Sequence, residues 1–338
     1  MGLCASYFLW ETTMRIAFYR NIGIPFNGDD DIKGTGGLEI QAIGLGREFA
    51  KRGHEVIFYV HCLNPDVYDG VTYKKVSDYQ DNADISIGID VAPPESKGKR
   101  VSWTHTPGLD CYSSDLDFIV CNSPWTLAHY QRNKPSDNYI MIPNGFSYDT
   151  FSNQSVKKRN SIMFAGHPMK NMCSLPAIFK KVKDKIPSVT CDVYGGSTLW
   201  KQPDSMYQNV YDSLREAGIN YHGLVPREEL IQAFQTSEIY FLPRSGYTET
   251  FGLSVIEAMT AGCVPICSKK GNLTNLLAIK DSGVLLEYDE SVDEAQAIID
   301  LLNDEVKLAR LRWGATEAAK QYDWPNVASV WEKEVFKI

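Results

Sequence analysis

The chain has 338 residues, 43% of them hydrophobic and 22% charged, with a formal net charge of −8 at pH 7. This length exceeds that of a typical single domain, so we expect two domains, each with its own core. The acidic balance provides no electrostatic footprint for a nucleic-acid partner, and no run reaches the eighteen or so apolar residues of a membrane-spanning helix.

Residues 1–13 carry no clear fold signal. Met1-Gly2 through Ser6 fits the loose pattern for N-myristoylation, with Cys4 as a candidate for palmitoylation. We favour an uncertain extension ahead of a start at Met14, because short motifs match by chance and a plausible first strand begins there. A secretory signal is not expected, since the apolar segment is very short and contains Glu11.

Residues 14–150 are predicted to form a first Rossmann-like domain. The strand at 14–19 is followed by a polar loop at 27–37, a helix at 38–52 and a strand at 53–60. This is a β-loop-α-β unit whose glycines let the backbone approach a ligand closely. The three aspartates of the loop are better explained by a mobile, solvated segment than by a metal site.

Three further strands are expected in this half, at 83–89, 100–104 and 117–121, and the segment 139–146 closes it. Ser123 is the predicted N-cap of the helix that begins at Pro124. His105 follows the strand at 100–104, at the carboxyl end where open α/β sheets bind their ligands. The position therefore favours a functional histidine over one satisfied within a turn.

Residues 147–160 are polar and are predicted to be an interdomain linker. The second domain is placed at 156–322, with strands at 161–165, 189–194 and 283–287 and two amphipathic helices running to about Tyr322. Asp323-Trp324-Pro325 indicates a break. A last helix follows within 323–338, from Asn326 to Phe336.

The most informative stretch runs from Ile239 to Gly262. An apolar run closed by Pro243 predicts a buried strand, and Phe251 to Gly262 predicts a helix ended by glycine. Glu249 precedes the helix, whose N-terminus has unpaired N–H groups and suits a phosphate. Glu257 lies roughly 9 Å further along the axis. This spacing suits a nucleotide diphospho-sugar.

Glu249 and Glu257, with seven residues between them and Phe-Gly-Leu shortly after the first, resemble the Glu-x7-Glu signature of retaining GT-B glycosyltransferases, especially family 4. The resemblance covers nearly all of residues 14–338. It implies an α/β fold of GT-B architecture, in which an acceptor-side domain and a donor domain face each other across a cleft and the C-terminal helix crosses back to the first domain.

The resemblance also implies a function. A sugar would move with retention from a UDP- or GDP-sugar to a hydroxyl on a glycan, lipid or small molecule. No metal or other cofactor and no nucleic acid is expected. The cytoplasm is the expected location, with peripheral contact at the cytoplasmic face of a membrane left open.

Residue by residue, the resemblance assigns catalytic roles to Glu249, Lys170 and His105. The family's glycine-rich loop corresponds to Gly36-Gly37, and its phosphate-binding Gly-Arg corresponds to Gly166-His167, so the usual arginine is a histidine here. The residues expected to bind the donor are Gly36, Gly37, Gly166, His167, Thr250, Phe251, Gly252, Leu253 and Glu257.

Three alternatives stay open. A nicotinamide-dependent oxidoreductase also has βαβ units, but its glycine fingerprint should follow the first strand tightly. A catalytically weak or inactive GT-B-like protein that binds sugar or nucleotide is the stronger rival, because His167 departs from the family pattern. A GT-B phosphorylase or epimerase is the third. The eight scattered cysteines are expected to be buried free thiols in a reducing compartment, and a zinc site is not expected.

Overall fold

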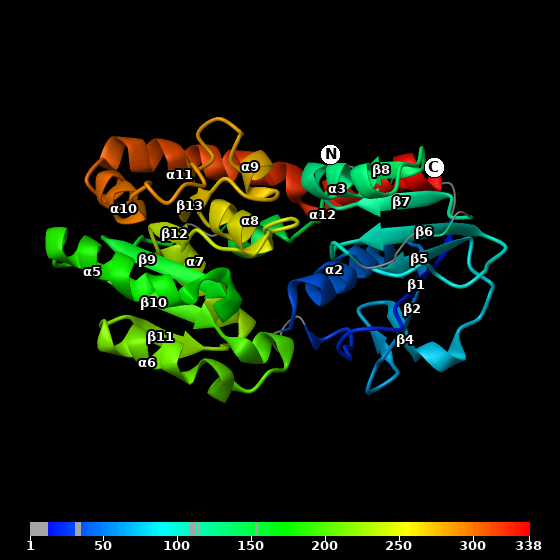
Figure 1. Cartoon of the computed structure of the whole chain (residues 1–338). Coiled ribbons are helices and arrows are strands. Elements are labelled where there is room, and N and C mark those ends of the chain that lie inside the picture. The colour runs from blue at the N-terminus through cyan, green and yellow to red at the C-terminus, as the bar shows by residue number, and fades with distance from the viewer. Residues whose placement is uncertain (1–12, 31–34, 109–112, 114, 153–154) are drawn as a thin grey trace, which may run out of the picture.

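The computed structural model describes residues 13–30, 35–108, 113, 115–152 and 155–338. The interpretation of residues 1–12 lies outside these ranges, as does Asp31 of the polar loop. Two α/β lobes lie side by side, and the red C-terminal helix spans from one to the other (Figure 1).

The first lobe is built on an eight-stranded sheet in the order β3-β4-β2-β1-β5-β6-β7-β8. Only the β3–β4 pair is antiparallel. The central strands are buried on both faces, as the apolar runs predict for a parallel sheet. Its elements are β1 (Arg15–Tyr19), α2 (Gly37–Lys51), β2 (Glu55–Val60), β3 (Val67–Tyr68), β4 (Val71–Lys75), β5 (Ile85–Ile89), β6 (Lys99–Thr104), β7 (Phe118–Cys121), α3 (Pro124–Asn133) and β8 (Tyr139–Met141).

The second lobe has a six-stranded, all-parallel sheet in the order β11-β10-β9-β12-β13-β14. The strand order reverses at β9, and ligands of open α/β sheets bind at the carboxyl ends beside such a switch point. Its elements are β9 (Ser161–Gly166), α5 (Leu175–Lys185), β10 (Thr190–Gly195), α6 (Gln208–Glu216), β11 (Asn220–Gly223), α7 (Arg227–Thr236), β12 (Ile239–Leu242), α8 (Leu253–Thr260), β13 (Val264–Ser268), α9 (Leu273–Leu276), β14 (Val284–Leu286), α10 (Glu294–Leu302) and α11 (Glu305–Ala319).

The segment between the sheets is more ordered than a polar linker. It contains a short helix, α4 (Tyr148–Phe151), and the Phe151 side chain is buried among second-lobe residues. Lys157 donates hydrogen bonds to the carbonyls of Phe234 and Ala261, near the ends of α7 and α8. The predicted interdomain linker therefore packs in part onto the second lobe, through the side chains of Phe151 and Lys157.

The C-terminal helix returns to the first lobe, as expected. Helix α12 (Trp324–Trp331) starts earlier than predicted, because Asp323 caps it and Pro325 occupies its first turn, where a missing N–H costs nothing. It continues as a π-helical turn, Glu332–Phe336. Trp331 is fully buried against Trp103 of β6, with ring centroids 5.5 Å apart.

No helix in the described part of the chain is long and apolar enough to cross a membrane.

Candidate functional site

The loop that joins β12 to α8 carries the first glutamate of the predicted pair. Helix α8 begins at Leu253 rather than Phe251, because Gly252 adopts a left-handed conformation with φ of +94°. A Cβ at Gly252 would also lie 3.0 Å from Leu276 Cδ1. Within the described residues no side chain caps this helix. The N–H groups of Val255 and Ile256 donate to the Gly252 carbonyl, which leaves those of Leu253 and Ser254 as the N–H groups that a ligand could use.

The two glutamates have different cationic partners. Glu249 Oε1 lies 2.6 Å from Lys170 Nζ, and both side chains are largely buried. Glu257, on the helix, forms an ion pair with Arg227, the first residue of α7. The pairs face different cavities: Lys170 and Glu249 line a small one, whereas Arg227 and Glu257 line a cleft of about 920 Å³.

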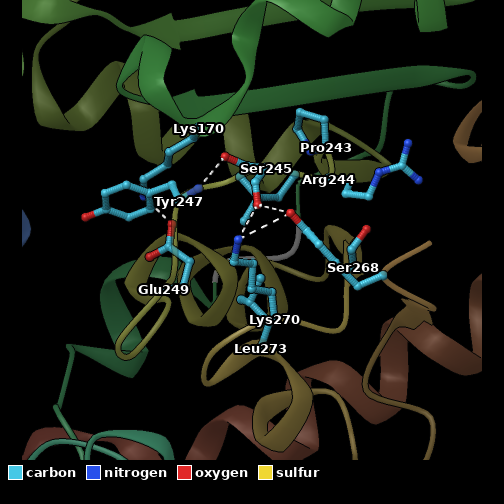
Figure 2. Close-up of a pocket in the computed structure, with 11 residues that line it drawn as sticks. Lys170, Pro243, Arg244, Ser245, Tyr247, Glu249, Ser268, Lys270 and Leu273 are labelled. Carbon is cyan, nitrogen blue, oxygen red and sulfur yellow. Dashed lines mark hydrogen bonds and ion pairs between the residues drawn. The ribbon is translucent and has the colours of Figure 1, made fainter. Parts of the chain in front are cut away.

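Lys170 is held in its charged form by this pairing. Burial opposes the charge, but the adjacent Glu249 carboxylate outweighs it and raises the pKa of Lys170. The lysine comes from the turn after β9, and Gly166 lies against its stem, since a Cβ there would be 3.1 Å from Lys170 Cδ. Figure 2 shows Lys170, Tyr247 and Glu249 together on one side of the loop.

The first lobe contributes two contacts to this region. Gly37 opens α2, and a Cβ there would lie 3.7 Å from Leu253 Cδ2 at the start of α8. Ser123 Oγ, at the N-cap of α3, donates to the Thr250 carbonyl at 2.5 Å. The start of α2, at Gly37, and the start of α8, at Leu253, therefore meet across the lobes. The sequence motifs predict each of these two segments but not their contact.

Gly36 lies beside these contacts, next to the Glu39 side chain. The Glu39 carboxylate folds back over it, so that a Cβ on Gly36 would lie 2.4 Å from Glu39 Oε2. Glu39 is buried at the α2 N-terminus, and this burial raises its pKa.

His105 lies after β6, at the carboxyl edge of the first sheet. Its ring packs edge-on against Trp103 at 4.4 Å, and its Nδ1 is 4.0 Å from Asp90 Oδ1. Neither ring nitrogen makes a hydrogen bond of good distance and angle within the described residues, although the Asn144 side chain and the Trp103 backbone lie near enough to favour its protonated form. Burial lowers the pKa of His105 to about 4 despite the nearby Asp90, so the imidazole is neutral at pH 7.

His167 does not present a free nitrogen. The Met169 N–H donates to Nδ1 at 3.2 Å, and Nε2 pairs with Gln202 Oε1 at 3.1 Å. This pattern fixes the Nε2-protonated, neutral tautomer. Burial also lowers the pKa of His167. The residue at the family's arginine position therefore supplies no positive charge.

Several residues of this region carry no sequence motif. Lys270 donates to the carbonyls of Ser245 and Gly246 at 3.0 and 2.7 Å, and Asn272 Nδ2 donates to the Phe251 carbonyl at 2.9 Å. Arg227 is the partner of Glu257. An isolated cation or amide has no characteristic spacing in a sequence. No local pattern therefore marks Lys270, Asn272 or Arg227 as contacts of this site.

The described residues contain no group of three or more His, Cys, Asp or Glu side chains arranged to hold a metal ion. Five cysteines are buried free thiols, while Cys173 is an exposed one, and Cys4 and Cys111 lie outside the described residues.

Two α/β lobes with a shared cleft and a returning C-terminal helix define a GT-B fold. Solved structures agree with this over nearly the whole chain. Sucrose-phosphate synthase from Thermosynechococcus elongatus superposes with a TM-score of 0.76 at 16% identity, covering 96% of this chain and 98% of its own. Anabaena Alr3699/HepE in complex with UDP gives 0.74 at 15% identity, covering 96% and 100%, and its complex with UDP-glucose gives 0.74 at 14%, with the same coverage.

The family model described as glycosyl transferases group 1 matches residues 148–320, just over half of the sequence. The chain therefore belongs to the glycosyl transferases group 1 family. Among curated relatives, the phosphatidyl-myo-inositol mannosyltransferase of Mycolicibacterium smegmatis is 26% identical over 198 residues, which is 56% of this chain and 50% of that protein. The chain thus spans about half the length of this relative.

Proposed function

We propose that this protein transfers a sugar from a nucleotide-diphosphate donor to a hydroxyl acceptor, with retention at the anomeric carbon. The observation that carries the proposal is the Lys170–Glu249 ion pair beside the uncapped start of α8, opposite Gly37 of the other lobe. A cation and a helix N-terminus together favour an anion. The adjacent carboxylate suits sugar hydroxyls.

The main catalytic demand is stabilising the negative charge of the departing diphosphate. In this proposal the N–H groups around Gly252 and Leu253, together with Lys170 and the Gly36-Gly37 backbone, meet that charge. Thr250 and Phe251 shape the loop through their backbone carbonyls, which are held by Ser123 and Asn272. The diphosphate would compete with Glu249 for Lys170 and so free the carboxylate to orient the sugar.

Glu257 would bind the ribose diol. Its side chain lines the cleft between α2 and α7, where an ion pair with Arg227 fixes its direction. The departing phosphate oxygen itself would help to remove the acceptor's proton, so no separate base is assigned. His105, neutral and buried at the carboxyl edge of the first sheet, would position a sugar hydroxyl.

We further propose that the reaction needs no metal or other cofactor. UDP or GDP is the expected nucleotide, and the solved Anabaena complexes with UDP and UDP-glucose support the first. The name of the mycolicibacterial relative contains a phosphatidyl lipid, which supports a lipid-linked hydroxyl as one acceptor class. A cytoplasmic enzyme with peripheral contact at the cytoplasmic membrane face fits such an acceptor.

The test is to incubate the protein with UDP-glucose and GDP-mannose, with and without EDTA, and to follow release of the nucleotide diphosphate. A transferase should release it slowly without acceptor, and proton NMR of the first-formed sugar should show the donor's anomeric configuration. A first-formed sugar with the opposite anomeric configuration would contradict the proposed retaining mechanism.

The neutral His167 favours a second candidate, a GT-B-like protein that binds nucleotide but does not catalyse transfer. Nucleotide binding by calorimetry with no release over a day would select this candidate.

A further inference from the structure

We propose that Trp200 and Tyr247 form an aromatic shelf that binds the apolar face of the transferred sugar ring, next to the Lys170–Glu249 pair. The proposal rests on the proposed function and specifies one of its subsites. Each ring is 36% exposed, and the ring centroids lie 6.1 Å apart with an interplanar angle of 39°. Two large, half-exposed rings in contact are an apolar surface ready for a ligand.

His167 provides the support for the shelf. Trp200 stacks on it with ring centroids 3.8 Å apart and planes 13° from parallel. Gln202 and the Met169 N–H hold the imidazole in place from its edges, and Tyr207 packs against it edge-on at 5.4 Å. A flat, neutral imidazole at this position can stack against an indole ring. The histidine therefore orients Trp200 instead of binding phosphate.

Tyr247 joins the shelf to the charged pair. Lys170 Nζ lies 5.6 Å from the centre of the Tyr247 ring, and the loop that carries Tyr247 also carries Glu249 (Figure 2). An aromatic surface beside a carboxylate combines what a pyranose needs, because the C–H face of the sugar is apolar and its hydroxyl rim is polar. Ligand sites typically pair a broad apolar wall with a few placed polar groups.

The position of the shelf favours the sugar over the nucleobase. Tyr247 lines the small cavity with Lys170 and Glu249, whereas Glu257 and Arg227 line the wide cleft. A donor with its diphosphate at the start of α8 and its ribose at Glu257 would direct the base away from Tyr247. Only the substituent on the far phosphate would reach the shelf.

The experiment compares matched ligands on matched variants. Calorimetry gives the affinities of the purified protein for UDP against UDP-glucose, and for GDP against GDP-mannose. Trp200→Ala and Tyr247→Ala should each weaken binding of the nucleotide sugar about tenfold while leaving the nucleotide alone within about twofold. Trp200→Phe and Tyr247→Phe keep a ring and should retain most of the affinity. Trp313→Ala, which removes a ring that is 69% exposed on α11, is the control.

An equal loss for nucleotide and nucleotide sugar would mean that the base occupies the shelf, and would overturn the proposal. Unchanged affinity for both ligands in the Trp200 and Tyr247 alanine variants would overturn it as well. If Trp200→Ala fails to fold, Tyr247→Ala and Trp200→Phe decide the result. A wild-type protein that binds none of the four ligands would refute the proposed function itself, which distinguishes that failure from loss of the shelf alone.

Discussion

Lys170 and Glu249 form an ion pair, so under the proposed function a ligand that binds one of them would have to take the place of the other. The ion pair is short and largely buried, which keeps water away from both groups. In such a site a charge is worth more than in water, because screening is weak. Under the proposed function, a diphosphate would therefore gain more from Lys170 than from a lysine at the surface.

Replacing Lys170 with alanine tests this at the level of turnover. We expect kcat to fall by a factor on the order of 10², the usual cost of losing one preorganised charge-stabilising group. Nucleotide release at saturating UDP-glucose or GDP-mannose would measure it. Lys170→Arg retains the charge and is the control, and wild-type turnover in Lys170→Ala would remove this residue from the mechanism.

Glu257 is the second residue to test. Glu257→Gln keeps the shape but loses the charge that holds Arg227, and Glu257→Ala removes both. Loss of a charged hydrogen bond to the ribose should weaken nucleotide binding by roughly tenfold or more. Calorimetric titration with UDP and GDP measures the dissociation constant, and an unchanged value in both variants would count against the ribose role.

His105 makes the free energy of unfolding depend on pH in the acidic range. Its pKa is lowered from 6.5 to about 4, so the folded protein binds fewer protons than the unfolded chain between these values. The stability linked to His105 is fully present above pH 6.5 and is lost as pH falls towards 4. His105→Asn should therefore lose less stability than wild type over this interval, as urea unfolding at a series of pH values would show. Parallel curves would contradict the burial argument.

At the scale of elements, the loop from Arg244 to Gly252 is held from several sides. Asn171 Nδ2 donates to the Arg244 carbonyl at 2.6 Å, and the Asn272 N–H donates to the Glu249 carbonyl at 2.8 Å. Lys270 binds the Ser245 carbonyl, and Tyr288 Oη donates to the same carbonyl at 2.9 Å. The Glu249 carboxylate on this loop is kept in position without being part of a helix or strand.

Gly271 offers a way to displace this loop. Its φ is +57°, and a Cβ there would lie 2.4 Å from the Glu249 backbone oxygen. Gly271→Ala should shift Glu249 and lower kcat/KM by a factor on the order of 10², the cost of a misplacement of about 1 Å. Gly246→Ala, in the same loop but with nothing within 4 Å, is the matched control. Equal activity in the two variants would show that the loop tolerates the shift.

At the scale of the whole molecule, α12 attaches the C-terminal end of the chain to the first lobe. Trp331 packs on Trp103 and, at 6.4 Å, on Phe49 of α2. Glu332 accepts a hydrogen bond from Arg52 at 2.6 Å and pairs with His54 at 3.2 Å. Because the helix follows directly from the second lobe, these contacts limit how far the lobes can separate.

Removing the Trp331 ring should therefore destabilise the protein. Trp331→Ala leaves a large cavity in the first lobe, which costs about 3–5 kcal/mol in comparable cores. Val330→Ala, on the same helix at a position that is 36% exposed, should cost far less. Urea unfolding followed by circular dichroism measures both. A loss in Trp331→Ala no greater than in Val330→Ala would mean that the helix contributes little to the attachment.

Many residues of the candidate site could be predicted from the sequence, because each belongs to a short local sequence pattern. The Ser123 N-cap, the glycine that ends α8 and the carboxyl-end positions of His105 and Lys170 all follow from neighbouring residues. The packing of the interdomain linker could not be predicted from the sequence, for the opposite reason. Phe151 and Lys157 have no local pattern and acquire their role only by packing on α7 and α8.

Local patterning was sufficient for the α/β class, for the strands and helices that the sequence analysis names, and for the positions of Glu249 and Glu257, because periodicity and turn residues act over a few positions. Strands such as β4 and β11 were not predicted. Only the tertiary structure determined which charged side chains pair. It also determined that His167 is neutral and stacks against Trp200, and that Gly37 contacts Leu253 across the lobes. Those facts depend on side chains from distant segments meeting in space, and burial sets their charge and their direction.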